Sequence, residues 1–246
     1  MYKKISFALV YCLSALILSF SAAWFFLKEA NFSYGFWHDH TSIKYAIDKY
    51  GAQNHFKQGF ELTTKAEREA LFAQIAQAIV NHGKGLADIR FEVAGHASQT
   101  LLREAEVTHL QDVANLIDLS PLLVIPALLI WLLQLGLLVS RRQGPPSYVI
   151  QSIALAGGMG LVGLVVLAIG PVKVFNQLHI WAFPSGHQWF FYYQESLMST
   201  MMHAPILFGW IAMEWACLAV VCYGVLQILT AKGLRLWQSR AGQVEA

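Results

Sequence analysis

A short polar run near the middle of the chain places one histidine between two acidic side chains at helical spacing. Residues 104–113 read EAEVTHLQDV. Three-residue spacing puts Glu106, His109 and Asp112 near one face of a helix. A carboxylate beside an imidazole can fix the orientation of the ring and raise its pKa, which suits a general base. We therefore expect Glu106 and Asp112 to orient His109.

Two other interpretations of this run stay open. A helix in solvent often carries such a polar face without doing any chemistry. An E-x-x-H spacing can also bind a metal ion on a helix, but such a site needs a second helix of the same kind. We find no second helix of this kind in the sequence. We expect no metal site here.

A second cluster lies in residues 171–204, which hold His179, His187 and His203 among many aromatic side chains. Tryptophan and tyrosine are favoured at bilayer surfaces, so an aromatic belt explains much of this composition. The histidines are harder to explain in this way. His179 closely follows an apolar stretch, and it is the histidine best placed to meet His109.

The four residues Pro184-Ser185-Gly186-His187 match the central motif of lipid phosphatases related to phosphatidic acid phosphatase. In that reaction His187 would be the nucleophile, and cations would have to hold the phosphate. The nearest cation is Lys173, no Arg-Pro pair follows it, and no Ser-Arg or second His–Asp segment follows His187. We therefore expect a turn at this position, and a phosphatase is the least favoured function.

The elements that must position these clusters belong to a membrane protein. The chain is 56% hydrophobic and 13% charged, and its mean hydropathy is +0.46. A helix of about 20 apolar residues crosses a bilayer. We predict a mainly α, polytopic membrane protein with four transmembrane helices, at residues 5–27, 119–139, 148–170 and 205–230.

The distribution of charge predicts the orientation of these spans. With four spans both termini share one side, and the basic flanks Lys3-Lys4, Arg141-Arg142, and Lys232 with Arg235 and Arg240 fall on that side. The positive-inside rule makes this side cytoplasmic. All nine histidines then lie outside the cytoplasm or at the outer membrane edge. The chemistry is expected to face outwards.

The first span has a second interpretation, as a secretory signal peptide. Lys3-Lys4 precede the apolar run, and the small residues Ser21-Ala22-Ala23 lie near its end. The apolar run continues through Trp24-Phe25-Phe26, which is long for a signal core, so we expect an uncleaved anchor. The three cysteines lie in apolar spans without a CxxC pair, which argues against a disulfide framework. The net charge of +2 gives no reason to expect nucleic acid as a partner.

Residues 28–118, with the loop 171–204, are expected to form a small extracytoplasmic α+β cap on a single membrane domain, 1–246. Thr64 and Glu67 form a capping-box pattern before a helix that Gly83 ends. Ile89, Phe91 and Val93 alternate with polar residues and predict a β-hairpin with residues 98–102. The stretch 104–118 is expected to be the outer end of one long helix that continues into the second span. In the fourth span, we expect the carboxylate of Glu214 to hydrogen-bond another span.

Both histidine clusters together resemble a known family. Residues 106–113 are similar to the E-x-x-H-[LM]-x-D-V motif of the bacterial lipoprotein intramolecular transacylases, which are four-span membrane proteins of about this length. Residues 175–198 resemble the family's second motif, a histidine followed by aromatic residues, a tryptophan and Leu-Ile; Leu197-Met198 stand at the last two positions. The sequence departs from the pattern at Ala114, where a lysine is usual, and in the spacing from His179 to Trp189.

The resemblance implies a function. The sn-2 acyl chain of a lipoprotein's diacylglyceryl cysteine would move to the α-amino group of that cysteine, leaving a lyso-form lipoprotein. His109 and His179 would be catalytic, as base and acid in either order. Phe183, Trp189 and Phe191 are possible substrate-lining residues. No cofactor is implied, and the partners would be diacylglyceryl-modified lipoproteins and membrane phospholipid in the bacterial cytoplasmic membrane.

A function of a different class also stays open. A non-catalytic membrane scaffold or chaperone could use the cap to bind a lipid or protein partner. The two functions differ on one point, because an enzyme needs His109 and His179 within reach of one substrate and a scaffold does not.

Overall fold

The computed structural model of the protein describes residues 2–244, and their side chains from residue 5 to residue 241. Contacts divide the chain into two compact units. The first, here called the membrane unit, comprises Met1–Phe25, Pro121–Phe175 and Trp215–Ala246; the second, called the cap unit, comprises Phe26–Ser120 and Asn176–Glu214. The side chains of Lys3 and Lys4, used above to orient the chain, lie outside the described ones. A single domain over 1–246 stays a prediction.

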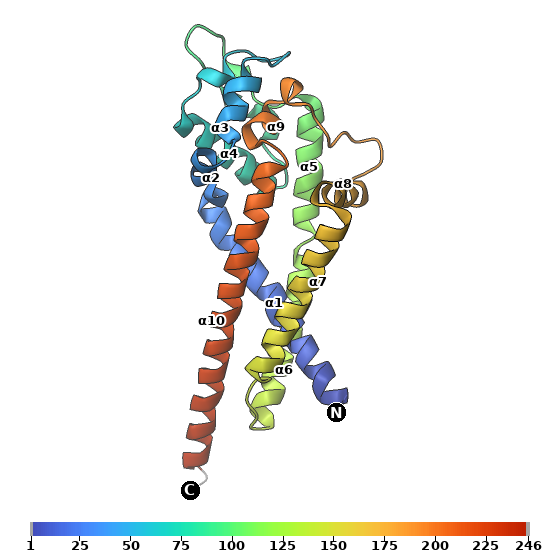
Figure 1. Ribbon diagram of the computed structural model, residues 1–246. Coiled ribbons are helices and arrows are strands. Elements are labelled where there is room, and N and C mark those ends of the chain that lie inside the picture. Colours follow the sequence, from blue (N-terminus) through green and yellow to red (C-terminus); the bar gives the residue numbers. More distant parts are fainter. Residues whose placement is uncertain (1, 245–246) are drawn as a thin grey trace. The chain divides into compact units, whose positions relative to one another are not determined.

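Four helical stretches are long and apolar enough to cross a membrane, as predicted. They are Ile5–Glu29, Glu104–Ser140, Tyr148–Ile169 and Ile206–Ala241. The helices that contain them are α1 (Tyr2–Glu29), α5 (Glu104–Asp118) followed by α6 (Pro121–Ser140), α7 (Tyr148–Ile169) and α10 (Ile206–Val244). Figure 1 shows these long helices and the shorter cap elements. The predicted mainly α fold with four transmembrane helices is confirmed.

Polar side chains link the helices of the membrane unit. The Tyr11 hydroxyl donates to Oε1 of Gln227 at 2.7 Å. The Tyr223 hydroxyl donates to Oε1 of Gln151 at 2.9 Å. The Gln134 amide of α6 donates to the carbonyl oxygen of Phe7 in α1 at 3.1 Å. In an apolar environment such interhelical bonds satisfy groups that would otherwise be unpaired, so they specify which helices pack together.

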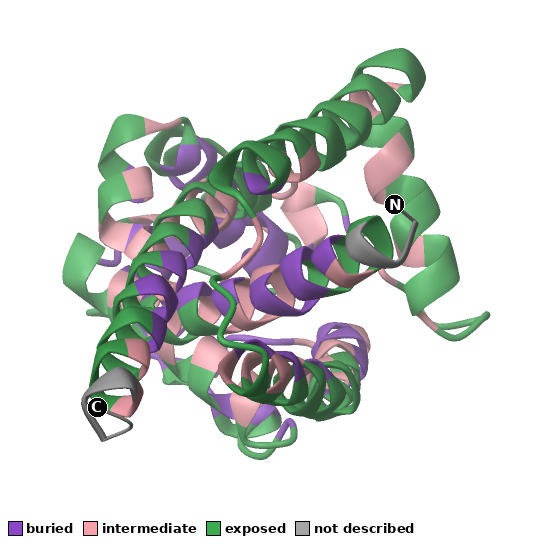
Figure 2. Ribbon diagram, turned by 90° about the horizontal axis from the view of Figure 1, so that it is seen from below, coloured by how far each residue is buried: buried purple, intermediate pink, exposed green. Residues whose placement is uncertain are grey.

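The outer surfaces of α6 and α7 are apolar and exposed. Leu122, Leu133, Leu161 and Leu167 are each more than 60% exposed. Figure 2 shows that exposed residues continue along most of the length of the long helices. An aqueous solvent would make this surface an aggregation hazard, whereas lipid chains solvate it without cost. The exposure pattern therefore supports a membrane location.

The cap unit is built from short elements. Its chain begins with the 3-10 turn η1 (Asn31–Ser33), α2 (Tyr34–His40), α3 (Ile43–Ala46), the π-helical turn η2 (Ile47–Gly51) and the 3-10 turn η3 (Phe60–Leu62). It continues with α4 (Lys65–Val80), the 3-10 turn η4 (Leu86–Asp88), β1 (Arg90–Phe91), β2 (Gln99–Thr100) and α5. After α7 come α8 (Pro171–Ala182), the 3-10 turn η5 (Tyr193–Glu195) and α9 (Leu197–Met202). Phe175 and the residues of α8 before it belong to the membrane unit.

Two local predictions in the cap are confirmed. Thr64 caps α4 by accepting a hydrogen bond from the backbone of Glu67, and the Glu67 carboxylate accepts one from the backbone of Thr64 in return. Strands β1 and β2 pair antiparallel, with Arg90 opposite Thr100. The hairpin is shorter than its alternating pattern predicted, because only two residues of each strand pair.

The predicted helical stretch through residues 104–139 is present, as Glu104–Ser140, but a short turn interrupts it. Helix α5 ends at Asp118, Leu119 and Ser120 form a turn, and α6 begins at Pro121. Proline lacks an N–H, so Pro121 cannot donate the hydrogen bond that would continue α5, and it is well tolerated at the first turn of α6. The break at Pro121 therefore separates the helix that carries His109 from the apolar helix after it.

The cap core contains a buried cation, Arg68, and each of its three guanidinium nitrogens has a hydrogen-bond partner. Arg68 is 4% exposed. Its Nε donates to the Thr63 hydroxyl at 3.0 Å, and Nη2 donates to the Glu61 carbonyl oxygen at 2.9 Å. Nη1 lies 3.3 Å from Nε2 of His38. A guanidinium can only donate, so Nε2 accepts, and Nδ1 of His38 is the nitrogen that faces Asp39 at 2.9 Å.

Glu214 has a different partner from the predicted one. The Ser33 hydroxyl donates to its Oε1 at 2.6 Å, and the Trp37 indole donates to its Oε2 at 3.1 Å. Ser33 and Trp37 belong to η1 and α2, whereas we expected a hydrogen bond to another span. The carboxylate thus ties the start of the cap to α10.

Candidate active site

Glu106 lies at the start of α5, where it holds two segments of the cap together. Its side chain is fully buried. One oxygen accepts from the backbone N–H of Arg103 at 2.6 Å and closes the helix start. The other accepts from the Ser196 hydroxyl, and from the backbone N–H of Met198 at 3.4 Å. Glu106 therefore fixes the start of α9 against α5.

His109 lies one turn further along α5 and is enclosed by rings. It is 9% exposed. The Phe183 ring packs edge-on at 4.9 Å between centroids, and the Phe191 ring lies at 6.0 Å. The Nδ1 atom is buried and has no hydrogen-bond partner among the described residues. A buried polar nitrogen without a partner is costly to the fold and is available to a substrate.

The rings of His109 and His179 lie face to face, with 6.2 Å between their centroids and 28° between their planes. His109 comes from α5 and His179 from α8, and both belong to the cap unit. His179 thus meets His109, as its position in the sequence predicted. That the two rings act on one substrate stays a prediction.

The aromatic residues singled out in the sequence gather around this pair. Phe183 lies 5.2 Å from His179, and Trp189 lies 5.0 Å from it, between ring centroids. Phe191 is buried, whereas His179, Phe183 and Trp189 are half-buried. His109 thus forms the inner wall of the site, and His179 lies nearer the surface.

Asp112 does not contact His109 by a hydrogen bond; it binds a different histidine. Its Oδ2 lies 2.7 Å from Nδ1 of His187. The side chain of His187 is 43% exposed and that of Asp112 is 9% exposed. Together with the contacts of Glu106, this makes the predicted direct orientation of His109 by Glu106 and Asp112 wrong. Their positions on α5 flank His109, and their carboxylates turn to either side of it.

The Pro184–His187 segment forms the expected turn. The backbone N–H of His187 donates to the Pro184 carbonyl oxygen at 3.2 Å, and Gly186 has a φ of 95°. A side chain at Gly186 would be strained, because only glycine adopts this conformation readily. The turn brings His187 to Asp112.

The surroundings of His109 are largely apolar. Its ring is buried among aromatic side chains, and the His179 imidazole lies beside it. A neutral imidazole can accept a proton, as a general base must.

Burial lowers the pKa of the Lys57 ammonium, and the Glu106 carboxylate opposes this shift. Within residues 5–241 no group of three or more His, Cys, Asp or Glu side chains is arranged to hold a metal ion.

Comparison with known proteins gives one clear result. A solved structure covers 97% of this chain and 93% of its own, with a TM-score of 0.60 and 16% sequence identity. It is the in meso structure of the membrane integral lipoprotein intramolecular transacylase Lit from Bacillus cereus, in a form with a histidine-to-arginine mutation. The chain has the fold of a lipoprotein intramolecular transacylase. No protein-family model and no curated protein sequence matches it.

The likeness to the transacylase Lit confirms the resemblance seen in the sequence at the level of the fold. At 16% identity it carries no residue roles. Those roles depend on the geometry of this chain's own side chains.

Sequence reasoning missed Ser196, which donates to Glu106 from 90 positions away. Ser196 also accepts from the backbone N–H of Ser199 at 2.9 Å and so caps α9. Serine followed by the apolar Leu197-Met198 is a helix-start signal, and it could have located α9. It could not have revealed the contact with Glu106.

Proposed function

We propose that this protein is an intramolecular acyltransferase that moves the sn-2 acyl chain of a diacylglyceryl lipoprotein cysteine to the α-amino group of the same cysteine. One observation carries the proposal: His109 and His179 stand 6.2 Å apart between ring centroids, inside an aromatic enclosure. The transacylase fold supports it. The product is a lyso-form lipoprotein.

The reaction needs two proton transfers, and two imidazoles can perform them. The amine nitrogen attacks the ester carbonyl carbon, and a neutral imidazole takes the proton that the amine loses. A C–N bond forms and the C–O bond to glycerol breaks. The second imidazole, in its protonated form, gives a proton to the departing glycerol oxygen. The histidine that accepted a proton and the one that gave it then exchange protons with water to restore the starting state.

The geometry suits these roles. The unpartnered Nδ1 of His109 is free to bond the substrate, because no described group competes for it. His179, nearer the surface, faces the same space. The chain has no need of an external nucleophile or cofactor, since the amine and the ester belong to one molecule. Holding the two together supplies much of the rate by proximity.

The aromatic enclosure sets the environment of the reaction. Phe183, Trp189 and Phe191 pack around the two imidazoles, and with a substrate bound they would exclude water from them. Exclusion of water keeps the amine neutral and protects the ester from hydrolysis. We assign these three side chains to the lining of the substrate site. The hydrocarbon of the acyl chains would remain in the surrounding lipid.

The same proposal includes a location. The protein would reside in the bacterial cytoplasmic membrane, with the histidine pair on the extracytoplasmic face and both termini in the cytoplasm. The basic flanks Arg141-Arg142, Lys232 and Arg235 support this orientation. Diacylglyceryl-modified lipoproteins are anchored in the extracytoplasmic leaflet of this membrane, where the site would meet them.

Mass spectrometry of lipoprotein N-terminal peptides tests the proposal. Peptides from cells that produce the protein should carry an N-acyl group and one acyl chain on glycerol. Peptides from matched cells without it should carry a free amine and two acyl chains on glycerol. Identical peptide masses in the two samples would favour a scaffold or chaperone instead.

A further inference from the structure

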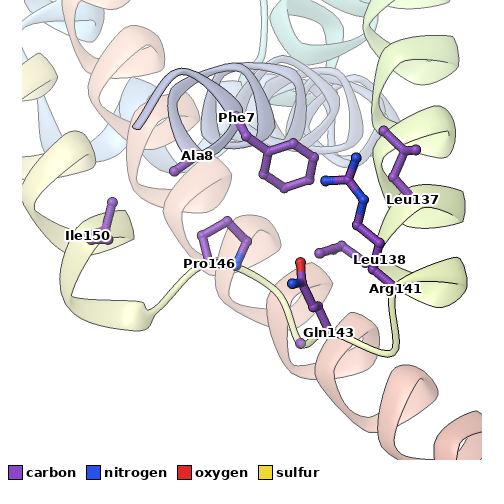
Figure 3. Close-up of a pocket in the computed structure, with 9 residues that line it drawn as sticks. Phe7, Ala8, Leu137, Leu138, Arg141, Gln143, Pro146 and Ile150 are labelled. Atoms are coloured by element: carbon purple, nitrogen blue, oxygen red, sulfur yellow. The ribbon is translucent and has the colours of Figure 1, made fainter. Parts of the chain in front are cut away.

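A cavity in the membrane unit is built from groups that the proposed reaction does not use. Its volume is about 390 Å³, within the size range of small-molecule sites. It is lined by Phe7 and Ala8 of α1, by Leu137, Leu138 and Arg141 at the end of α6, and by Gln143, Gly144, Pro146 and Ile150. Figure 3 shows these side chains around one space.

Among the described residues that line the cavity there is one cation and no anion. The Arg141 guanidinium is directed into the same space as the Phe7 ring and the Leu137 side chain (Figure 3). Within residues 5–241 we find no ion pair or hydrogen bond of this side chain to another residue. None of the lining residues is acidic. The described lining is therefore electrostatically complementary to an anion and offers no carboxylate to a positively charged group.

Most of the other lining side chains are apolar. Phe7, Leu137, Leu138 and Ile150 give it a hydrocarbon surface, and the Gln143 amide supplies one further hydrogen-bonding group. An ion that is fully hydrated, such as inorganic phosphate, gains nothing from such a wall. A molecule with an anionic head and a hydrocarbon part uses both the guanidinium and the wall.

The position of the cavity in the chain selects the ligand. Arg141, Gln143 and Pro146 lie in the short connection between α6 and α7, which both have the length and composition of membrane spans. A connection between two spans lies at a membrane surface, where phospholipid headgroups are the most abundant anions. Basic pockets between transmembrane helices are known sites for acidic headgroups.

We propose that this cavity binds an anionic glycerophospholipid, with its phosphodiester on Arg141 and the first part of an acyl chain against Phe7, Leu137 and Ile150. The lipid fills the space between α1 and the α6–α7 connection and so joins these segments. A lipid with a cationic headgroup amine is disfavoured, because the lining holds a cation and no carboxylate. The inference does not depend on the reaction proposed above.

Binding is measured on the full-length protein in detergent, by native mass spectrometry during titration with phosphatidylglycerol or with phosphatidylcholine of the same acyl chains. We expect the protein to retain phosphatidylglycerol more tightly. Arg141→Gln should weaken phosphatidylglycerol binding about tenfold or more, the loss expected for one charge-assisted contact, and should weaken the already weaker binding of phosphatidylcholine less. Arg141→Lys should keep part of the affinity.

Two further variants separate this site from surface charge and from misfolding. Arg240 is exposed and lines none of the cavities described, so Arg240→Gln should bind phosphatidylglycerol as the unchanged protein does. Ile150→Trp should fill the cavity and exclude the lipid while Arg141 remains in place. Equal binding of the two lipids, an unaffected Arg141→Gln variant, equal losses in the Arg141→Gln and Arg240→Gln variants, or undiminished binding by Ile150→Trp would each overturn the proposal.

A competition experiment distinguishes lipid from free anion. Inorganic phosphate and glycerol phosphate are added to the protein with bound phosphatidylglycerol. We expect neither to displace the lipid at millimolar concentration. Displacement by either would show that the cavity is a site for soluble phosphate and would contradict the assignment to a lipid.

Discussion

Nδ1 of His187 lies 2.7 Å from Oδ2 of Asp112, so the turn Pro184–His187 is tied to the helix that carries His109. This contact turns the Asp112 carboxylate towards His187, so Asp112 does not hydrogen-bond His109 although it is only three residues away. The loop between α8 and η5 carries Phe183, Trp189 and Phe191, which enclose the histidine pair. Asp112 thus acts on the site by holding its lining in place.

Asp112→Ala should loosen this loop. We expect faster amide hydrogen exchange in residues 184–191 and a loss of acyl transfer of about two- to fivefold, since a partly exposed contact between a histidine and a carboxylate contributes little. Asp118→Ala is a matched control, because Asp118 lies on the same helix and pairs with His82 at 2.9 Å. The control should retain its activity. A loss in Asp112→Ala as large as that in His109→Ala would instead assign Asp112 to the chemistry.

Glu106→Gln should destabilise the cap. The carboxylate is fully buried and accepts from Arg103, Ser196 and Met198, so a neutral amide in its place weakens charge-assisted bonds and puts an N–H₂ against donors. We expect a loss of about 1–3 kcal/mol in unfolding free energy, measured by chemical denaturation in detergent. Glu104→Gln, an exposed position in the same first turn, should change it by less than about 0.5 kcal/mol. Equal stability of the two variants would contradict the assigned role of Glu106.

The sequence predicted those parts of the fold that local patterns encode. Four apolar stretches predicted the spans, Thr64 with Glu67 predicted the start of α4, and alternation around Phe91 predicted the hairpin. Each of these signals spans fewer than about 25 residues of chain. The break between α5 and α6 was also encoded, by Pro121, but the surrounding apolar residues obscured it.

The partners of the polar side chains could not be predicted in the same way. Spacing on a helix placed Glu106, His109 and Asp112 near one face, but it does not say which loop packs against each side chain. Ser196 and His187 reach α5 from residues far along the chain. For the same reason the expected hydrogen bond from Glu214 to another span was wrong. The Glu214 carboxylate accepts from Ser33 and Trp37 of the cap.

The Ser33–Glu214 hydrogen bond can be tested by a double-mutant cycle. We expect Ser33→Ala and Glu214→Gln each to lower the unfolding free energy, and the double variant to lose about 1 kcal/mol less than the sum of the two. Coupling arises because each single change removes the same bond. Additive losses in chemical denaturation would show that the two side chains do not interact in the folded protein.

Chelators should leave acyl transfer unchanged. The proposed reaction moves protons between nitrogen and oxygen atoms only, and His109 and His179 supply both transfers. Purified protein is treated with EDTA and with a zinc chelator, and transfer to a synthetic diacylglyceryl lipopeptide is followed by mass spectrometry. Activity abolished by chelation and restored by zinc would identify a metalloenzyme and refute the two-imidazole mechanism.

The most direct test of the central claim compares three histidine variants in that assay, His109→Ala, His179→Ala and His187→Ala, at equal amounts of folded protein. Removal of a general acid or base costs about a hundredfold to ten-thousandfold in rate, so His109→Ala and His179→Ala should each lose lyso-lipopeptide formation to this extent. His187→Ala should lose far less, because His187 only holds the loop to Asp112. Inactivity of His187→Ala alone, with the other two variants active, would contradict the assignment of the site.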